Sequence, residues 1–452
     1  MITAKNYNKN GQNELKCMSK NKLKKISTYL LGALIVFLPW QTRLILIPGE
    51  LKNSFWEYGT VSLYALDFLM MFFLFVSSGY LILQYEKEKK IWTLGTLLAL
   101  FILLIAFLSL NFSTNHLAGL FWLIKLSEAV LFFLVITQLK PNFKIVNKSL
   151  VIAGVLQGIL AIYQGITQQV FASPWLGMSA QLPGTLGVQV VETATARILR
   201  SYGSLPHPNM LAGFLVITIL AAIFLLMTQK KYWQQGFLFL ALLIMSAGLW
   251  LTFARQALLA LGIVILLTIG YTFISKKIFP KNLTLGMLAV VFPLVILSLI
   301  FPQTILTRVS AQTRLEQKSL QERQDYTRDA LKILQKNWIT GVAIGNYTAY
   351  QNRQDQDHHQ EQPGWAYQPV HNIYLLVFTE LGIFGLLAFL LFLFSLFFKA
   401  NWQNEAELQG ILSLLALLVI GFFDHYLWSL SFGLLLFWLV AGLLESNKSS
   451  KA

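Results

Sequence analysis

Charged side chains are scarce in this sequence. Asp, Glu, Lys and Arg make up 12% of the 452 residues, about half the share found in an ordinary soluble domain, whereas hydrophobic residues make up 56%. A soluble protein needs a charged and polar surface, and this chain has too few such residues to cover one. The composition therefore excludes an ordinary water-soluble fold and indicates that lipid is the solvent.

Cysteine is nearly absent, since Cys17 is the only one, so the chain cannot form an internal disulfide. Acidic residues are also few, and the formal net charge is +15. Such a charge could suggest binding to nucleic acid. In a membrane protein, however, basic residues first report orientation, because cytoplasmic loops retain Lys and Arg. We therefore interpret the positive charge as a sign of which loops face the cytoplasm, and we expect no nucleic-acid partner.

Long apolar runs recur along nearly the whole chain. A helix needs about 20 residues to cross a hydrocarbon core of roughly 30 Å. The sequence predicts an all-α fold, a polytopic transmembrane helical bundle of about 12 spans that forms one domain over residues 26–444. The expected spans are 26–40, 59–83, 91–110, 117–138, 149–170, 208–228, 236–252, 255–274, 283–301, 370–398, 408–424 and 426–444.

The stretch 236–274 has no Gly or Pro at its middle. One unbroken helix of that length would measure about 58 Å at 1.5 Å per residue, far more than the bilayer thickness. A lysine pair precedes the stretch and another follows it. Both ends are therefore expected on the cytoplasmic side, which requires two spans joined by a turn. We therefore expect a tight turn near Phe253.

Lysines predict which side each connection faces. Residues 1–25 carry seven lysines and precede a span without a convincing cleavage site, so we expect an uncleaved basic cytoplasmic tail. The C-terminal tail, 445–452, is then cytoplasmic too. Two long loops, 171–207 and 302–369, fall on the extracytoplasmic side. The connections expected inside all carry lysine, at 86–90, 140–148, 230–231, 276–281 and 399.

Arginines divide differently from lysines, because all nine fall on the predicted outer side. Arg presents a planar fork of donors that suits phosphate, so the exterior is predicted to hold an anion. A genome biased toward lysine codons, with arginine left as surface charge, is the alternative. It explains Arg255 less well, since a charge between two apolar spans is usually functional. The nine are Arg43, Arg197, Arg200, Arg255, Arg308, Arg314, Arg323, Arg328 and Arg353.

Three outer segments carry short motifs. They are RSYGSLPHPN at 200–209, TFARQA at 252–257, and GVAIGNY at 341–347 followed by VHNIYL at 370–375. In this order, and between these spans, they resemble the O-antigen ligase and polymerase (Wzy-type) family of integral-membrane bacterial glycosyltransferases. The resemblance is strongest over residues 195–400.

The resemblance implies a multi-pass enzyme of the bacterial inner (plasma) membrane. It implies a glycan donor linked to undecaprenyl diphosphate, and an acceptor hydroxyl on a lipid, a glycan or a protein. The enzyme would act on the extracytoplasmic face, surrounded by membrane lipids, in the assembly of lipopolysaccharide or another surface polysaccharide. No cofactor and no metal are implied.

Residue roles follow from the same resemblance. His371 matches the family's histidine before Asn and is expected to be the catalytic base. Arg255, Arg200 and, as a less certain match, Arg328 are expected to bind the diphosphate. Because the leaving group is already a diphosphate, catalysis needs charge stabilisation and a base for the acceptor. Supporting roles are expected for Asn209, Asn372 and Asp424.

Structural roles remain open for several of these residues. His371 could cap a helix or hydrogen-bond within its loop. Asn209, which follows Pro206 and Pro208, could begin a helix. Asp424 could pair with an arginine or only form a turn. For the whole chain, a transporter or flippase without covalent chemistry is the alternative function. No matching pair of Gly/Pro-broken spans, which would indicate a midplane transport site, is evident, and the polar residues gather at one face.

Overall fold

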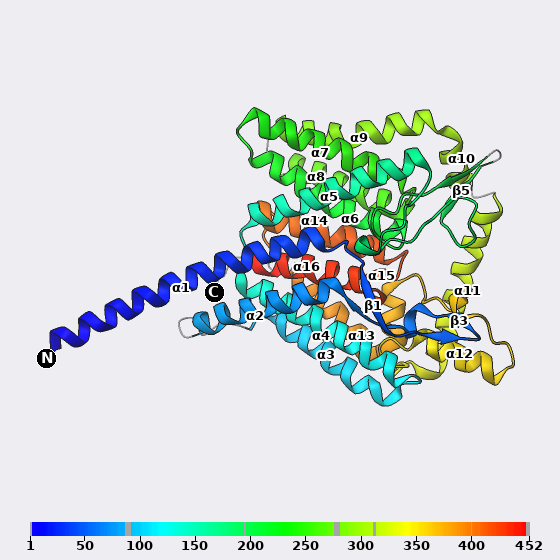
Figure 1. Ribbon diagram of the computed structural model, residues 1–452, viewed down its shortest axis with the longest axis horizontal. Coiled ribbons are helices and arrows are strands. Elements are labelled where there is room, and N and C mark those ends of the chain that lie inside the picture. The colour runs from blue at the N-terminus through cyan, green and yellow to red at the C-terminus, as the bar shows by residue number, and fades with distance from the viewer. Residues whose placement is uncertain are drawn as a thin grey trace.

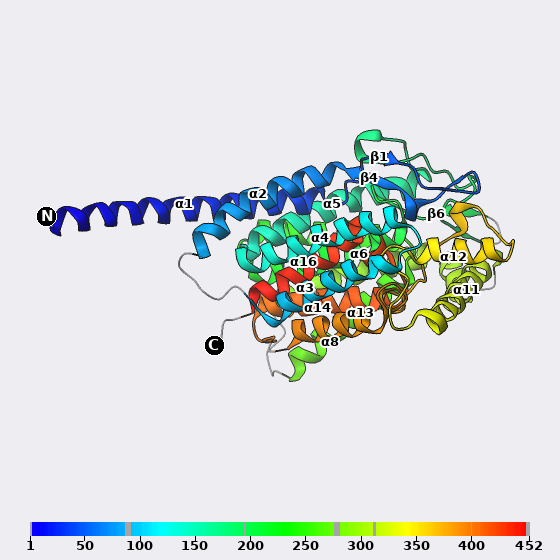
Figure 2. The same ribbon diagram turned by 90° about the horizontal axis from the view of Figure 1, so that it is seen from below.

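The long helices lie side by side in one bundle. The computed structural model describes residues 2–85, 92–193, 196–274, 281–310, 313–398 and 400–448. In Figures 1 and 2, α1 starts and α16 ends at the same end of the bundle, which we call the terminal end. The short strands and α10 to α12 gather at the opposite end, which we call the loop end. Segments far apart in the sequence therefore meet at one face.

Each expected apolar run lies largely in helix. The first six are α1 (Ile2–Phe37), α2 (Ala65–Tyr85), α3 (Leu94–Ser109), α4 (His116–Leu139), α5 (Phe143–Thr167) and α6 (Pro208–Thr228). The others are α7 (Tyr232–Leu251), α8 (Arg255–Ile274), α9 (Lys281–Ile300), α13 (Ile373–Phe397), α14 (Glu405–Gly421), α15 (Tyr426–Ser429) and α16 (Ser431–Asn447). Within the described ranges, nine helices are long and apolar enough to cross a membrane. The fold is therefore a mostly helical membrane bundle, and the count of twelve spans is not confirmed.

The break between α7 and α8 confirms the tight turn expected near Phe253. Helix α7 ends at Leu251 and α8 begins at Arg255. Phe253 takes a left-handed backbone conformation, with φ 51°, which is costly for a bulky residue. Its ring stays buried against Trp250, with ring centroids 4.8 Å apart. The turn is thus made without Gly or Pro, and packing holds it in place.

The loop end contains short strands that were not predicted. Three antiparallel pairs form, which the expectation of an all-α chain missed. They join β1 (Arg43–Ile47) to β4 (Val61–Tyr64), β2 (Glu50–Leu51) to β3 (Ser54–Phe55), and β5 (Val190–Glu192) to β6 (Arg197–Leu199). As a result, the span expected from residue 59 begins only at Ala65. The sequence VSLY of β4 is apolar enough to extend a hydrophobic run, yet its alternation suits a strand.

The second long loop is largely helical. It forms α10 (Pro302–Ser310), α11 (Arg314–Asn337) and α12 (Tyr347–Asp357), where one helical stretch was expected over 305–338. Helix α11 buries one face, which includes Glu316, Ala330 and Ile333. Because Glu316 and Ala330 are two seven-residue steps apart, the residue midway between them, Arg323, lies on the same face. This face lies against the bundle.

Two glycines let the chain cross α13 with backbone against backbone. Gly382 interrupts α13 with φ 67°, and Gly341 has φ 69°. A Cβ at Gly382 would lie 2.0 Å from the Ile339 carbonyl oxygen, and one at Gly341 would lie 2.2 Å from the Glu380 carbonyl oxygen. Gly is the residue type that supports both the left-handed φ and this approach. The crossing fixes residues 339–341, from which the chain continues to His371, against α13.

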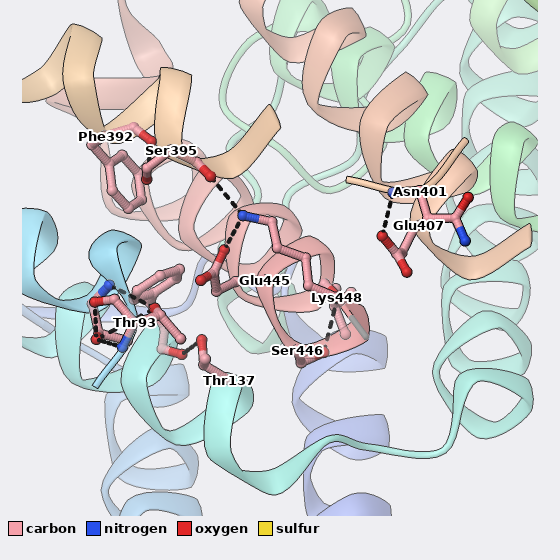
Figure 3. Close-up of polar contacts among 12 residues, drawn as sticks. Thr93, Thr137, Phe392, Ser395, Asn401, Glu407, Glu445, Ser446 and Lys448 are labelled. Carbon is pink, nitrogen blue, oxygen red and sulfur yellow. Dashed lines mark hydrogen bonds and ion pairs between the residues drawn. The ribbon is translucent and has the colours of Figure 1, made fainter. Parts of the chain in front are cut away.

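Polar contacts tie the helices together at the terminal end. Lys448 Nζ donates to the Ser395 carbonyl oxygen at 2.6 Å and forms an ion pair with Glu445 at 2.5 Å (Figure 3). Glu407 accepts a 2.6 Å hydrogen bond from the backbone nitrogen of Asn401 (Figure 3). The first two contacts hold the end of α16 against the last turn of α13, and the third holds the start of α14 against the connection that precedes it.

Candidate active site

Three arginines gather around the turn between α7 and α8. Arg200 Nε donates to the Thr252 carbonyl oxygen at 2.7 Å, and Arg308 Nη2 donates to the Phe253 carbonyl oxygen at 2.6 Å. Arg255 is the first residue of α8. The last carbonyl groups of a helix lack partners within it, so the two guanidinium groups satisfy the end of α7. Residues about fifty positions apart in the sequence thus meet at one turn.

A chain of buried polar groups leads away from Arg200. Its Nη2 donates to Asn209 Oδ1 at 2.6 Å, and Asn209 Nδ2 donates to Asp424 Oδ2 at 2.7 Å. Gln256 Nε2 donates to the same oxygen at 3.4 Å. His207 caps the start of α6, where its Nδ1 accepts from the Asn209 backbone nitrogen. Asn209 therefore does more than begin a helix, because its amide links an arginine to a carboxylate.

Two histidine rings continue this chain toward the surface. Asp424 Oδ1 accepts from the backbone nitrogen of His425, whose Nδ1 lies 2.6 Å from Ser429 Oγ. The rings of His425 and His371 meet edge to face, with centroids 4.8 Å apart. On its other side, His371 stacks on Tyr326 of α11 at 5.4 Å, with the planes 7° apart. His371 Nδ1 is buried and has no hydrogen-bond partner among the residues described.

Opposing effects act on the His371 imidazole. Burial lowers its pKa, the Asp424 carboxylate raises it, the positive charge of Arg323 lowers it and a hydrogen bond to the Pro369 backbone raises it, so that the net result is a pKa below the ordinary 6.5. At neutral pH the ring is therefore uncharged. An uncharged imidazole with an unpaired nitrogen is a proton acceptor.

The neighbouring groups keep complementary states. Burial lowers the pKa values of His207 and His425 to about 3. Burial acts to raise the pKa of Asp424, but the three nearby histidines and the hydrogen bond from Asn209 outweigh it, so the pKa falls to about 2. Asp424 is thus ionised at neutral pH while the imidazoles around it are neutral.

The Arg255 side chain is held by a backbone carbonyl group and a carboxylate. Its Nη1 donates to the Arg308 carbonyl oxygen at 2.6 Å, and its Nη2 lies 3.1 Å from Glu316 Oε2. Glu316 also forms an ion pair with Arg308 through Oε1. The Arg255 side chain is 43% exposed, whereas that of Glu316 is 6% exposed. One buried carboxylate thus holds two arginines at the start of α11.

Two predicted residues lie apart from this cluster or act structurally. Arg328 is 62% exposed and pairs with Asp325 one helical turn away, at 2.9 Å, so the structure does not bring it to the site. Asn372 caps α13, since its Oδ1 accepts from the Leu375 backbone nitrogen at 2.9 Å, and its Nδ2 donates to the Phe422 carbonyl oxygen. This cap orients the backbone immediately after His371.

The structure brings most of the predicted residues together and adds others. His371, Arg200, Asn209 and Asp424 form one connected cluster, and Arg255 lies at the adjoining turn. The sequence signal for the added residues was weak, because each depends on how α11 and the last loop fold back. Arg323, for example, lies on the bundle-facing side of α11 and forms no ion pair among the described residues. The added residues are His425, Tyr326, Arg323, Glu316 and Arg308.

A small pocket lies next to His425. Its walls include Tyr58, Pro369, Glu380 and Ser429. The Tyr58 ring contacts His425, and Trp428, also in the wall, donates to Glu380 at 2.8 Å. Within the described part of the chain, no group of three or more His, Cys, Asp or Glu residues could hold a metal ion.

Comparison with known families matches one segment of the chain. Residues 240–390 match the family model described as O-antigen ligase. The resemblance to the O-antigen ligase family is confirmed. The matched segment contains the α7–α8 turn, α10, α11 and His371, whereas Arg200 and Asn209 precede it and Asp424 follows it. A comparison with curated proteins found no significant match. The match and the apolar helices together support a membrane enzyme of polysaccharide assembly.

Proposed function

We propose that the protein transfers a glycan from an undecaprenyl-diphosphate-linked donor to an acceptor hydroxyl, as a ligase or polymerase of surface polysaccharide. The observation that carries the proposal is the continuous chain from Arg200 through Asn209 and Asp424 to His425 and His371. This chain links an imidazole whose Nδ1 has no hydrogen-bond partner among the described residues to a guanidinium group at the α7–α8 turn. A base and an anion-binding region are the two parts that this transfer needs.

In the proposed reaction, the acceptor oxygen attacks the anomeric carbon of the donor sugar. The new carbon–oxygen bond forms as the bond from that carbon to the diphosphate oxygen breaks, which inverts the configuration. The acceptor proton passes to His371, and the diphosphate leaves still attached to its lipid. Arg255 and Arg200 stabilise the charge that develops on the diphosphate. Because guanidinium groups supply this stabilisation, we propose a reaction that needs no metal.

The location of the site supports an outward orientation. The loop end carries the arginines, whereas the connections rich in lysine are expected at the terminal end, as the positive-inside rule requires. We therefore propose that the loop end faces the extracytoplasmic side of a bacterial plasma membrane. The lipid tail of the donor would stay in the bilayer while its diphosphate reaches the turn between α7 and α8. An acceptor lipid, glycan or protein would approach His371 from water.

The test compares site variants with exposed controls from the same loops. We expect His371→Ala and Arg255→Ala to leave membrane abundance unchanged while the lipid-linked donor accumulates. His358→Ala and Arg353→Ala should retain full glycan output, because both residues lie exposed in the second long loop. The measurement is the donor lipid and the polymeric glycan in cells, followed by transfer in proteoliposomes.

Two results would contradict the proposal. Normal glycan output from both His371→Ala and Arg255→Ala would dismiss the site. Movement of the intact donor across proteoliposomes without a new glycosidic bond would indicate a transporter instead. In a deletion strain, the molecule that loses its glycan identifies the acceptor.

A further inference from the structure

Glu316 occupies an unusual position among the ion pairs of the loop end. Its carboxylate lies between the guanidinium groups of Arg255 and Arg308, which belong to two different helices. Arg308 is also held by the Phe253 carbonyl oxygen, and Arg255 by the Arg308 carbonyl oxygen. Both guanidinium groups are therefore positioned by backbone groups, independently of Glu316. The carboxylate therefore lies between two guanidinium groups that backbone carbonyl groups also hold.

The fit of Glu316 to this space is incomplete. Its Oε2 lies within ion-pair distance of Arg255 but is not aligned for a hydrogen bond, and it is buried without any other partner among the described residues. The Arg308 Nε donor is likewise buried and unpaired. Unpaired buried charges and donors are costly. An anion with more acceptor oxygens than a carboxylate would satisfy these atoms better, and a phosphate group has three or more.

The charge balance around the turn points to the same ligand chemistry. Arg200, Arg255, Arg308 and Arg323 contribute four guanidinium groups, and Glu316 and Asp424 contribute two carboxylates. The charges of Arg308, Glu316 and Asp424 all act on Arg200, so these groups lie close together. With Glu316 in place, positive charges still outnumber negative ones by two, which favours a phosphate-bearing anion as the ligand.

We infer that the space between Arg255 and Arg308 is a phosphate site that Glu316 fills in the donor-free protein, and that the diphosphate of the donor displaces the carboxylate. This inference rests on the proposed function for the identity of the donor. It adds Arg308 as a phosphate ligand and makes Glu316 an internal competitor. Since Glu316 belongs to the first turn of α11, its displacement loosens the start of that helix.

A neutral side chain at position 316 shows whether Glu316 competes with the diphosphate or instead positions the arginines that bind it. An internal occupant lowers the apparent affinity by the fraction of molecules in which it fills the site, so Glu316→Gln should bind polyprenyl diphosphate about tenfold more tightly. Arg308→Gln should bind it about tenfold less tightly, because a charge-assisted hydrogen bond is lost. The matched control is Glu192→Gln, which removes a carboxylate that pairs with Arg314 of α11 at 3.6 Å. The control should leave the affinity unchanged.

Binding is measured on the full-length protein in nanodiscs, with polyprenyl diphosphate as the probe and phosphatidylglycerol as the competing phosphate source. Weaker or unchanged binding in Glu316→Gln overturns the inference, because a carboxylate that only positions the arginines would weaken binding when lost. Competition by phosphatidylglycerol as strong as that by unlabelled polyprenyl diphosphate overturns the assignment to the donor.

A measurement on the unaltered protein covers the case in which Glu316→Gln does not fold. Amide hydrogen exchange in residues 314–337 should become faster when polyprenyl diphosphate is added, because α11 loses its ion pairs at the first turn. Slower or unchanged exchange there overturns the inference. Neither readout requires glycan transfer. Tighter binding by Glu316→Gln in a protein that transfers no glycan would therefore retain the phosphate site and reject the proposed function.

Discussion

The His371 imidazole lies between a carboxylate and a guanidinium group whose charges act on its pKa in opposite directions. Burial and Arg323 favour the neutral ring, and Asp424 and the hydrogen bond to the Pro369 backbone favour the protonated ring. The neutral ring predominates at physiological pH. A base of this kind is present before the acceptor arrives, so no separate deprotonation is needed. The balance also means that each neighbour has a predictable sign of effect on activity.

We expect the transfer rate to rise with pH through the pKa of His371, with a midpoint below 6.5 and a plateau near neutrality. Because the pKa of His371 is lowered, the ring becomes protonated, and the base is lost, only at a pH below the pKa of an ordinary histidine. In Asp424→Asn the carboxylate that raises the pKa is gone, so the midpoint should shift to lower pH. The measurement is the single-turnover rate against pH.

Arg323→Gln provides the control of opposite sign. Loss of its positive charge should raise the pKa of His371 and move the midpoint to higher pH. The midpoint, and not the rate, is the readout, because Asp424→Asn also removes the acceptor for Asn209 and will slow the reaction for that reason. Midpoints that move in the same direction in both variants would show that His371 is not the titrating base.

At the scale of elements, α11 connects the two halves of the site. Glu316 in its first turn reaches the arginines, and Tyr326, about 15 Å further along the helix, stacks on His371. The same rigid helix therefore touches the predicted phosphate site and covers the predicted base.

How much of these elements the sequence could predict depends on what fixes each one. The bounds of α6 were predicted to the residue, because a span is defined by hydropathy alone. Helix α5 begins at Phe143, six residues before the expected start, because Asn142 caps it within a lysine-bearing segment. The strand pairs were missed because windows of span length merge a short strand such as β4 with the helix that follows it.

The candidate site divides in the same way. Motif residues such as His371 and Arg200 could be named from the sequence, because their chemistry is encoded in local order. The pairing of Arg255 with Glu316 could not, since the two lie sixty-one positions apart and meet only through the path of α10 and α11. The exposed position of Arg328 has the same cause, because the phase of α11 against the bundle decides which arginine faces inward.

The crossing of α13 gives a prediction at this scale. In Gly382→Ala the left-handed backbone alone should lower the free energy of unfolding by on the order of 1–3 kcal/mol. The contact with the Ile339 carbonyl oxygen should add to this. The measurement is the thermal unfolding midpoint in detergent, together with membrane abundance. The matched control is Gly262→Ala in α8, where a Cβ would meet nothing within 4 Å. Equal midpoints for both variants would contradict the argument.

For the whole molecule, both described chain ends lie at one end of the bundle, and α10 and α11, which carry Arg308 and Glu316, lie at the other (Figure 1). Such a separation is useful only if the two ends face different compartments. The donor diphosphate and the acceptor must then reach the loop end from the same side. Orientation therefore decides whether the proposed chemistry is available to surface polysaccharide at all.

The last prediction tests this orientation in a Cys17→Ser background. Gly184→Cys places a thiol in the first long loop, where a Cβ meets nothing within 4 Å, and Lys230→Cys places one on the exposed connection between α6 and α7. A membrane-impermeant maleimide should label position 184 in cells with an intact plasma membrane, and position 230 only after that membrane is permeabilised. The reverse pattern would place His371 in the cytosol, where an outward-facing donor could not reach it.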